Sequence, residues 1–191
     1  MAGCAAPGSR VLLSLSPNLT RKYCYTWELV EADGNWVGIN TGLPNRLARE
    51  AIGAGVVSEL LGYDNIRPEV AYGSNSRIDL LLTGEKGLCY VEVKNVTLVE
   101  GSTALFPDAV TTRGQKHLRE LMQVVAAGHR GVNLFLVQRQ DAVSMSPADT
   151  IDPVYGQLLR RAAESGVELL VYQAMVTPTE IRVTNSIPLH L

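Results

Sequence analysis

The chain has 191 residues, of which 46% are hydrophobic and 19% charged, and its formal net charge is −2. This composition excludes a disordered or low-complexity protein, and the length suits one full domain or one domain with a small addition. No apolar run is long enough to span a bilayer and no signal peptide is evident, so we expect no membrane partner. The charge balance disfavours a broadly basic nucleic-acid clamp but permits a local basic groove.

Three cysteines, Cys4, Cys24 and Cys89, lie far apart and form neither a CxxC pair nor a zinc-type spacing. An odd number of isolated cysteines is typical of reduced thiols, which indicates a cytoplasmic protein. The oligomeric state is not indicated by any of these features.

Residues 1–41 are expected to be all-β, with strands over Val11–Leu15, Tyr23–Val30 and Trp36–Asn40. The residues Ala32–Asn35 form a hairpin-type turn signal between the last two strands. Three short strands seldom form an independent core. The segment is therefore expected to be part of a larger β domain or a sheet added to the C-terminal domain.

From residue 42 onward, helical and strand patterns alternate, which predicts an α/β domain with a mixed sheet over residues 42–191. The expected helices are Pro44–Leu61, Gly114–Ala127 and Pro153–Ser165. The expected strands are Glu69–Tyr72, Arg77–Leu82, Leu88–Val96, Gly131–Val137 and Val167–Tyr172. The second and third of these strands are joined by a short glycine-containing loop and form a hairpin.

The most informative stretch is this hairpin, which carries Asp79 on one strand and Glu92 and Lys94 on the next. Side chains alternate across a strand, so Glu92 and Lys94 point to the same face. Asp79 is flanked by Ile78 and a run of leucines. A carboxylate in such a run needs a partner, because burying an unpaired charge is costly. That partner is either Lys94 or a divalent cation.

Two carboxylates on one face offer hard oxygen ligands for Mg²⁺ or Mn²⁺. Such a metal activates a water and neutralises charge on a phosphate, and a neighbouring lysine orients the water or stabilises the developing charge. Asp79, Glu92 and Lys94 therefore match the catalytic residues of a PD-(D/E)xK nuclease hairpin, with Ile78 in place of the proline. The alternative is a salt bridge on a solvated sheet face, since E-x-K tripeptides are common on exposed strands.

A third metal ligand is expected from the first helix, where Glu50 is the candidate. The alternative is that Glu50 pairs with Arg46, one turn earlier, on a surface face of the helix. Glu69 is a further acidic candidate.

The start of the second helix is a candidate phosphate site, with Thr112 expected as its cap. Backbone amides at a helix N-terminus, together with Arg113 and Lys116, suit a phosphate group. Gln115 is the catalytic candidate in this turn, whereas His117 adjoins the apolar stripe and is interpreted as a packing residue. The alternative is an ordinary capped surface helix with polar residues in its first turn.

A basic and aromatic cluster lies in the N-terminal segment, where Arg21, Lys22 and Tyr23 precede Tyr25 and Trp27. Such a mixture is used by OB-type surfaces that bind single-stranded nucleic acid. The alternative is an ordinary β domain with packed aromatic residues.

Several sequence blocks run in order along nearly the whole chain: Gly3–Gly8, Arg21–Tyr23 with Thr26–Leu29, Asn40–Thr41 with Asn45–Leu47, Ser76–Asp79, Val91–Leu98, Phe106–Thr111 and Arg113–Leu121. In this order they resemble the sugar fermentation stimulation protein family. The resemblance implies a DNA-binding OB-like N-terminal domain, a PD-(D/E)xK nuclease-like domain, and a link to the regulation of sugar metabolism, including maltose use.

The chain departs from the family it resembles in one respect. Family members usually carry a longer stretch of sequence before the position of Met1. Residues 1–41 are therefore expected to form only a partial OB-like domain. The sequence leaves three functions open. One is a DNA-binding regulator that retains a nuclease-like metal site, and another is an active Mg²⁺- or Mn²⁺-dependent nuclease on DNA or RNA. The third is a structural or protein-interaction role.

Overall fold

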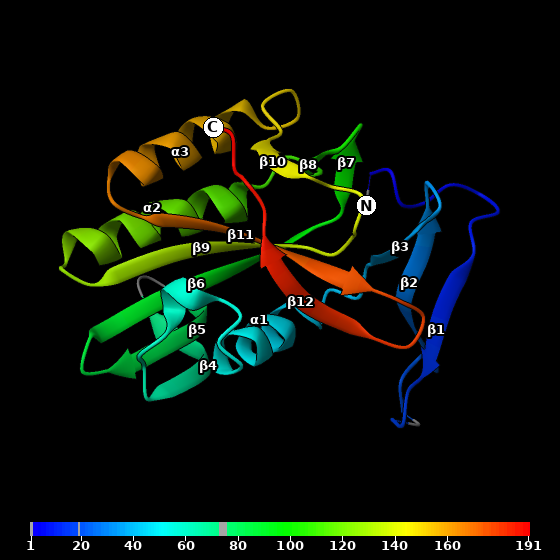
Figure 1. The fold of residues 1–191 in the computed structure, drawn as a ribbon, viewed down its shortest axis with the longest axis horizontal. Helices are drawn as coiled ribbons and strands as arrows, with labels where there is room; N and C mark the ends of the chain where they lie inside the picture. The colour runs from blue at the N-terminus through cyan, green and yellow to red at the C-terminus, as the bar shows by residue number, and fades with distance from the viewer. Residues whose placement is uncertain (1, 19, 73–75) are drawn as a thin grey trace.

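The structure is a computed structural model that describes residues 2–18, 20–72 and 76–191. Its elements in chain order are β1 (Val11–Leu15), β2 (Tyr25–Ala32), β3 (Asn35–Gly38), α1 (Pro44–Gly53), η1 (Ser58–Leu60), β4 (Asn65–Tyr72), β5 (Ser76–Gly84), β6 (Gly87–Val96), β7 (Leu98–Glu100), β8 (Thr103–Phe106), α2 (Thr112–Ala126), β9 (Arg130–Val137), β10 (Ser144–Pro147), α3 (Pro153–Glu164), β11 (Glu168–Val176) and β12 (Ile181–Ser186). Figure 1 shows their arrangement, and no helix in the described ranges is long and apolar enough to cross a membrane.

A six-stranded mixed sheet in the order β12-β11-β9-β6-β5-β4 forms the centre of the molecule. β6, β9 and β11 are parallel, and β4, β5 and β12 pair antiparallel with their neighbours. Parallel neighbours need long crossovers, which α2 and α3 supply after β6 and β9. Both helices lie on the same face of the sheet (Figure 1). The mixed α/β class expected from the sequence is therefore confirmed.

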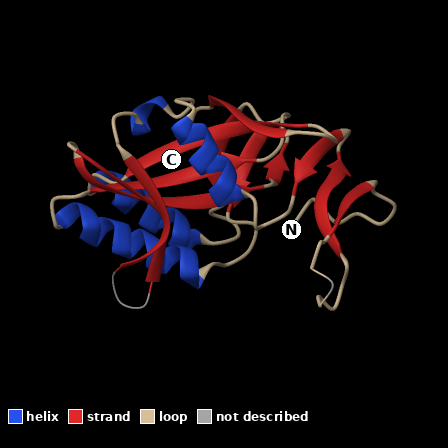
Figure 2. Ribbon diagram, turned by 90° about the horizontal axis from the view of Figure 1, so that it is seen from below, coloured by secondary structure: helices blue, strands red, loops and turns tan. Residues whose placement is uncertain are grey.

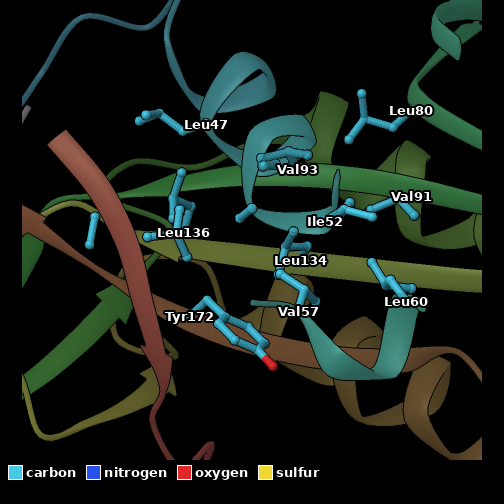
Figure 3. Close-up of a cluster of buried hydrophobic side chains, with 14 of the residues drawn as sticks. Leu47, Ile52, Val57, Leu60, Leu80, Val91, Val93, Leu134, Leu136 and Tyr172 are labelled. Carbon is cyan, nitrogen blue, oxygen red and sulfur yellow. The ribbon is translucent and has the colours of Figure 1, made fainter. Parts of the chain in front are cut away.

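Each face of the central sheet has its own hydrophobic core. On one face, α1 and η1 contribute Leu47, Ile52 and Leu60 to a cluster that includes Leu134 and Tyr172 (Figure 3). On the other face, the apolar sides of α2 and α3 pack against the sheet through residues such as Leu118, Leu121, Phe135, Leu158 and Leu159. The middle strands therefore have apolar side chains on both faces, as is usual for parallel strands covered by helices.

The N-terminal strands form a separate antiparallel sheet, β1-β2-β3, at one end of the molecule (Figures 1 and 2). A small core of Cys4, Val30, Val37 and Ile39 holds it together. This segment confirms the expectation that an all-β segment precedes the α/β domain. Its strand β2 begins at Tyr25 rather than at the expected Tyr23.

A buried arginine joins the N-terminal sheet to the central domain. Arg139 is only 1% exposed, and its guanidinium donates to both carboxylate oxygens of Asp141 at 2.7 and 2.5 Å. It also donates to the Thr97 carbonyl at 3.0 Å and to Asp33, in the β2–β3 turn, at 3.4 Å. One side chain thus holds three segments that are distant in sequence, because a guanidinium presents several donors in a fixed plane.

The first helix is shorter than expected, ending at Gly53 rather than at Leu61. Gly53 disfavours continuation of the helix, and Gly55 has a φ of +77°, a conformation that favours glycine. The expected remainder of the helix is instead a loop and the 3-10 turn η1. The sequence patterns also missed β7, β8, β10 and β12, which are short or largely exposed.

We predict that Arg139→Ala lowers the free energy of unfolding by about 3 kcal/mol, because it empties the space of a fully buried side chain and leaves the Thr97 carbonyl without its donor. The control is Arg160→Ala, which removes an exposed ion pair with Asp149 and should cost less than about 1 kcal/mol. Urea denaturation of both variants measures the difference. Equal losses would show that Arg139 does not join the two parts.

Candidate functional site

Asp79, Glu92 and Lys94 line one open pocket of about 300 Å³, at the place where β5 and β6 separate. The same pocket is lined by Asn45 at the start of α1 and by Glu69 on β4. The structure therefore brings together the three residues that the hairpin pattern indicated. Asn45 and Glu69 thus join these three residues from elements outside the hairpin.

The backbone is irregular at Asp79, which turns its carboxylate toward β6. Ile78 and Leu81 both face the core beneath α2 and α3, although a regular strand would place them on opposite faces. The described β5–β6 pairing starts at Leu80, and Asp79 Oδ2 accepts a hydrogen bond from the Val93 amide at 2.8 Å. A side chain thus replaces a backbone acceptor at this point of the sheet.

The second oxygen of Asp79 is held by Asn45, whose Nδ2 donates to Oδ1 at 2.8 Å. Burial raises the pKa of Asp79, and the neighbouring Glu92 carboxylate raises it further. Hydrogen bonds from Val93 and Asn45 and the charge of Lys94 counteract only part of this effect. The surroundings of Asp79 therefore disfavour the charged form of its carboxyl group.

Glu92 is the most buried of the acidic residues here, at 2% exposure. Its Oε1 accepts from Lys94 Nζ at 2.7 Å and lies within hydrogen-bonding contact of His117 Nδ1. Arg113 Nε donates to His117 Nε2 at 3.4 Å, and His117 Nδ1 also lies 3.2 Å from Lys94 Nζ, so the imidazole links Arg113 to the Glu92–Lys94 pair. Burial raises the pKa of Glu92, but His117 and Lys94 outweigh it and leave the pKa below its usual value.

The other carboxylate oxygen of Glu92, Oε2, is buried and has no hydrogen-bond partner among the residues that the structure describes. A buried, ionised oxygen without a partner is costly and calls for a cation or a donor. No group of three or more histidine, cysteine, aspartate or glutamate residues is arranged as a metal site in residues 2–18, 20–72 and 76–191. Two carboxylates still suit Mg²⁺, which commonly keeps several waters and adds substrate phosphates.

Glu50, expected as the third metal ligand, lies elsewhere. It is exposed, pairs with Arg46 at 3.5 Å, and lines a different pocket beside β12. The surface ion pair, which was the alternative, is the arrangement found. Glu69 lines the pocket of Asp79 and Glu92 instead, at an irregular point of β4 where its φ is +54° and where the regular pairing with β5 is interrupted.

Gln115, expected to be catalytic, does not line this pocket in the described structure. Its amide donates to both carboxylate oxygens of Asp152, at 3.0 and 3.1 Å, and Asp152 caps α3. The cap of α2 is Thr111 rather than Thr112. The residues of α2 that line the pocket are Arg113 and His117, and His117 lies on the buried side of the helix together with Leu118 and Leu121.

Arg113 and Lys116 lie where the sequence expected basic side chains, at the start of α2. They line a neighbouring pocket of about 410 Å³ together with Arg77. This basic pocket shares Glu69, Arg113 and His117 with the acidic pocket that Asp79 and Glu92 line, so the two are adjacent.

The N-terminal cluster of Arg21, Lys22 and Tyr23 is exposed in the loop before β2. Arg21 donates to Thr26 Oγ1 at 2.9 Å, and the Lys22 ammonium lies 5.3 Å from the centre of the Tyr23 ring. These residues line neither the acidic nor the basic pocket. A nucleic-acid contact here would be separate from the acidic site.

The fold defines a class: a mixed-sheet, restriction-endonuclease-like α/β protein preceded by an all-β segment. Comparison with known families agrees with this class. The profile of the sugar fermentation stimulation protein RE domain matches residues 42–180, and that of the SfsA N-terminal OB domain matches residues 1–39. The chain belongs to the sugar fermentation stimulation protein family.

Individual relatives agree with this assignment. The sugar fermentation stimulation protein homolog of Citrifermentans bemidjiense is 68% identical over 191 residues, covering 100% of this chain and 83% of the relative. The homolog of Geobacter sulfurreducens is 68% identical over 188 residues, covering 98% of this chain and 81% of the relative. A solved structure of Pyrococcus furiosus SfsA in complex with Ca²⁺ is similar with a TM-score of 0.89 at 28% identity, covering 97% of this chain and 80% of that one.

We predict that Asp79→Asn stabilises the cation-free protein at neutral pH, raising its melting temperature by about 2–4 °C in EDTA. Because the folded pKa of Asp79 is raised, the wild type loses stability as the pH rises from about 4, the pKa of an unfolded aspartate, through the folded value. The advantage of the variant should therefore be small near pH 4 and grow with pH. Thermal melts across pH test this, and a difference independent of pH would contradict it.

Proposed function

We propose that this protein binds DNA at the acidic pocket with a divalent cation, Mg²⁺ or Mn²⁺, held by Asp79 and Glu92. The observation that carries the proposal is the buried, unpartnered Oε2 of Glu92 in a pocket that Asp79 also lines, within the part of the chain that the structure describes. Support comes from the similar SfsA of Pyrococcus furiosus, whose structure is a complex with Ca²⁺. Both Ca²⁺ and Mg²⁺ prefer carboxylate oxygens, although they differ in size and in the number of ligands.

The adjacent basic pocket suits the phosphate backbone of the partner. Arg77, Arg113 and Lys116 line it, and side chains of this kind form charge-assisted hydrogen bonds with phosphate oxygens. When bound beside it, a divalent cation would neutralise charge on a neighbouring phosphate. A DNA strand would therefore contact basic side chains in one pocket and a bound cation in the adjacent pocket. This local positive charge allows a chain with a net charge of −2 to bind an anion.

A second candidate function is hydrolysis of the phosphodiester bond, and the position of Lys94 favours it. Its ammonium lies 2.7 Å from Glu92 Oε1 and lines the same pocket as Asp79. There it would orient an attacking water or stabilise charge that develops on the phosphate. Lys94 is mostly buried, with a side chain 11% exposed, so its charge is weakly screened by solvent.

The proposal includes a role in regulating sugar metabolism, including maltose use, in the cytoplasm. The family to which the chain belongs carries sugar fermentation stimulation in its name. The exposed Arg21, Lys22 and Tyr23 would then supply a second DNA contact on the N-terminal sheet, through phosphate contacts and stacking on a base.

The cation site is tested by titrating Mn²⁺ into the protein in a calorimeter. We expect binding to the wild type and loss of binding in Asp79→Ala and Glu92→Ala, because both variants remove a ligand. Glu50→Ala is the matched control, since the structure places this acid in another pocket and binding should be unchanged. No heat with the wild type, or unchanged heat in Asp79→Ala, would overturn the cation proposal.

Cleavage is tested with labelled single- and double-stranded DNA and RNA in Mn²⁺. If the second function is right, the wild type cuts at least one substrate and Lys94→Ala lowers the rate by at least about 100-fold, the size of a lost electrostatic contact in many active sites. Lys86→Ala is the control, since Lys86 donates to the Leu61 carbonyl away from the pocket. Salt-dependent binding without cleavage would leave the regulator as the function, whereas binding that ignores salt would argue against phosphate contacts.

A further inference from the structure

An aromatic pocket of about 210 Å³ lies between the start of β6 and the second half of α2. Tyr72, Tyr90 and His129 line it, with ring centres 5.8 Å apart for both the Tyr72–Tyr90 and the Tyr90–His129 pairs. Pockets for drug-sized ligands span roughly 300–1,000 Å³. This smaller cavity therefore suits a single planar ring system.

Two buried polar groups border the aromatic pocket without hydrogen-bond partners in the described part of the chain. They are the hydroxyl of Tyr72 and Oε2 of Glu120, which interact electrostatically with each other without a hydrogen bond of normal length. Glu120 is 7% exposed, and its other oxygen accepts from Ser76 Oγ at 2.7 Å and pairs with Lys116 Nζ at 3.6 Å. Leaving such groups unpaired costs about 1–3 kcal/mol each, so a ligand that supplies an N–H donor would be favoured.

The aromatic pocket shares no residue with the two pockets of the proposed DNA site, but its lining residues neighbour theirs. Tyr90 and Glu92 point to the same face of β6, two residues or about 7 Å apart along the strand. Glu120 lies one helical turn after Lys116, and it contacts Ser76 and Lys116, which line the basic pocket. A nucleic-acid strand with phosphates at the acidic and basic pockets would therefore pass the opening of the aromatic pocket.

We infer that the aromatic pocket receives one unpaired base of the bound strand and favours a base with an exocyclic amino group. This inference rests on the proposed DNA binding and adds a base specificity to it. The rings of Tyr90 and Tyr72 supply the stacking surface, which accepts any base. The free carboxylate oxygen of Glu120 supplies selectivity, because it accepts from an amino group such as N4 of cytosine, whereas thymine presents a carbonyl there. A small side-chain movement on binding exposes this oxygen to the base.

The test is an abasic scan of a fluorescein-labelled single-stranded oligonucleotide, measured by anisotropy in Ca²⁺. One abasic position should weaken wild-type binding by about 5- to 50-fold, the usual effect of losing one stacked base. In Tyr90→Ala the same abasic site should make no difference, because the stacking wall is gone. Tyr90→Phe keeps the ring and should retain the wild-type response.

Selectivity is tested at the position that the scan identifies, by comparing cytosine with thymine. The wild type should prefer cytosine by about 5-fold or more, the lower end of base discrimination by one good contact. Glu120→Gln should lose that preference, and Glu164→Gln, the same change at an exposed site of α3, should retain it. Only the ratio of affinities is compared, since Glu120 also contacts Lys116.

The outcomes separate this inference from the proposed function. A wild type that binds no oligonucleotide would overturn DNA binding and the base pocket together. A wild type that binds DNA but shows a flat abasic scan, or a response that persists in Tyr90→Ala, would overturn the base pocket alone. A positive scan with no cytosine preference would overturn the role of Glu120.

Discussion

The constraint on which the site depends is the burial of the Glu92 carboxylate beneath α2. Its Oε1 is held by Lys94 and His117, which come from the same strand and from the covering helix, and this keeps the carboxylate ionised. The second oxygen is left without a partner in the described residues. The unpaired acceptor and the neighbouring Asp79 carboxylate lower the stability of the cation-free protein. The same two groups favour the binding of a cation, which would remove this destabilisation.

The hairpin part of the site could be predicted from the sequence because it depends on local periodicity. Glu92 and Lys94 share a face of one strand whatever the rest of the fold does, and Asp79 is the carboxylate in the apolar partner strand. Three features were beyond that reasoning. The left-handed backbone of Glu69 is a local irregularity of the β4–β5 pair, and the helix containing Glu50 presents that side chain to solvent. His117 was interpreted as packing, and it is buried as expected, but a carboxylate faces it.

The rest of the fold also contains elements that local sequence patterns predict and elements that they do not. Long elements with strong periodicity, such as α2, α3 and β9, agree with the sequence patterns within a few residues. The short strands β7, β8 and β10 form a small sheet of their own, in which β8 pairs with its sequence neighbour β7 and with β10, about 40 residues later in the chain. Arg139, which joins the N-terminal sheet to the domain, has no signature in its local sequence, because its partners Asp33 and Thr97 are contributed by other segments. The division of the chain at residues 41 and 42 stays a prediction.

The central claim is that Asp79 and Glu92 together hold a divalent cation. Anomalous diffraction from crystals soaked in Mn²⁺ tests it most directly, because the signal locates the metal independently of activity. We predict one strong peak in the acidic pocket, at roughly 2–2.6 Å from carboxylate oxygens of both Asp79 and Glu92. The absence of a peak in the acidic pocket at saturating Mn²⁺ would contradict this claim. A peak bound instead by Glu50 or Glu180, in the pocket beside β12, would also contradict it.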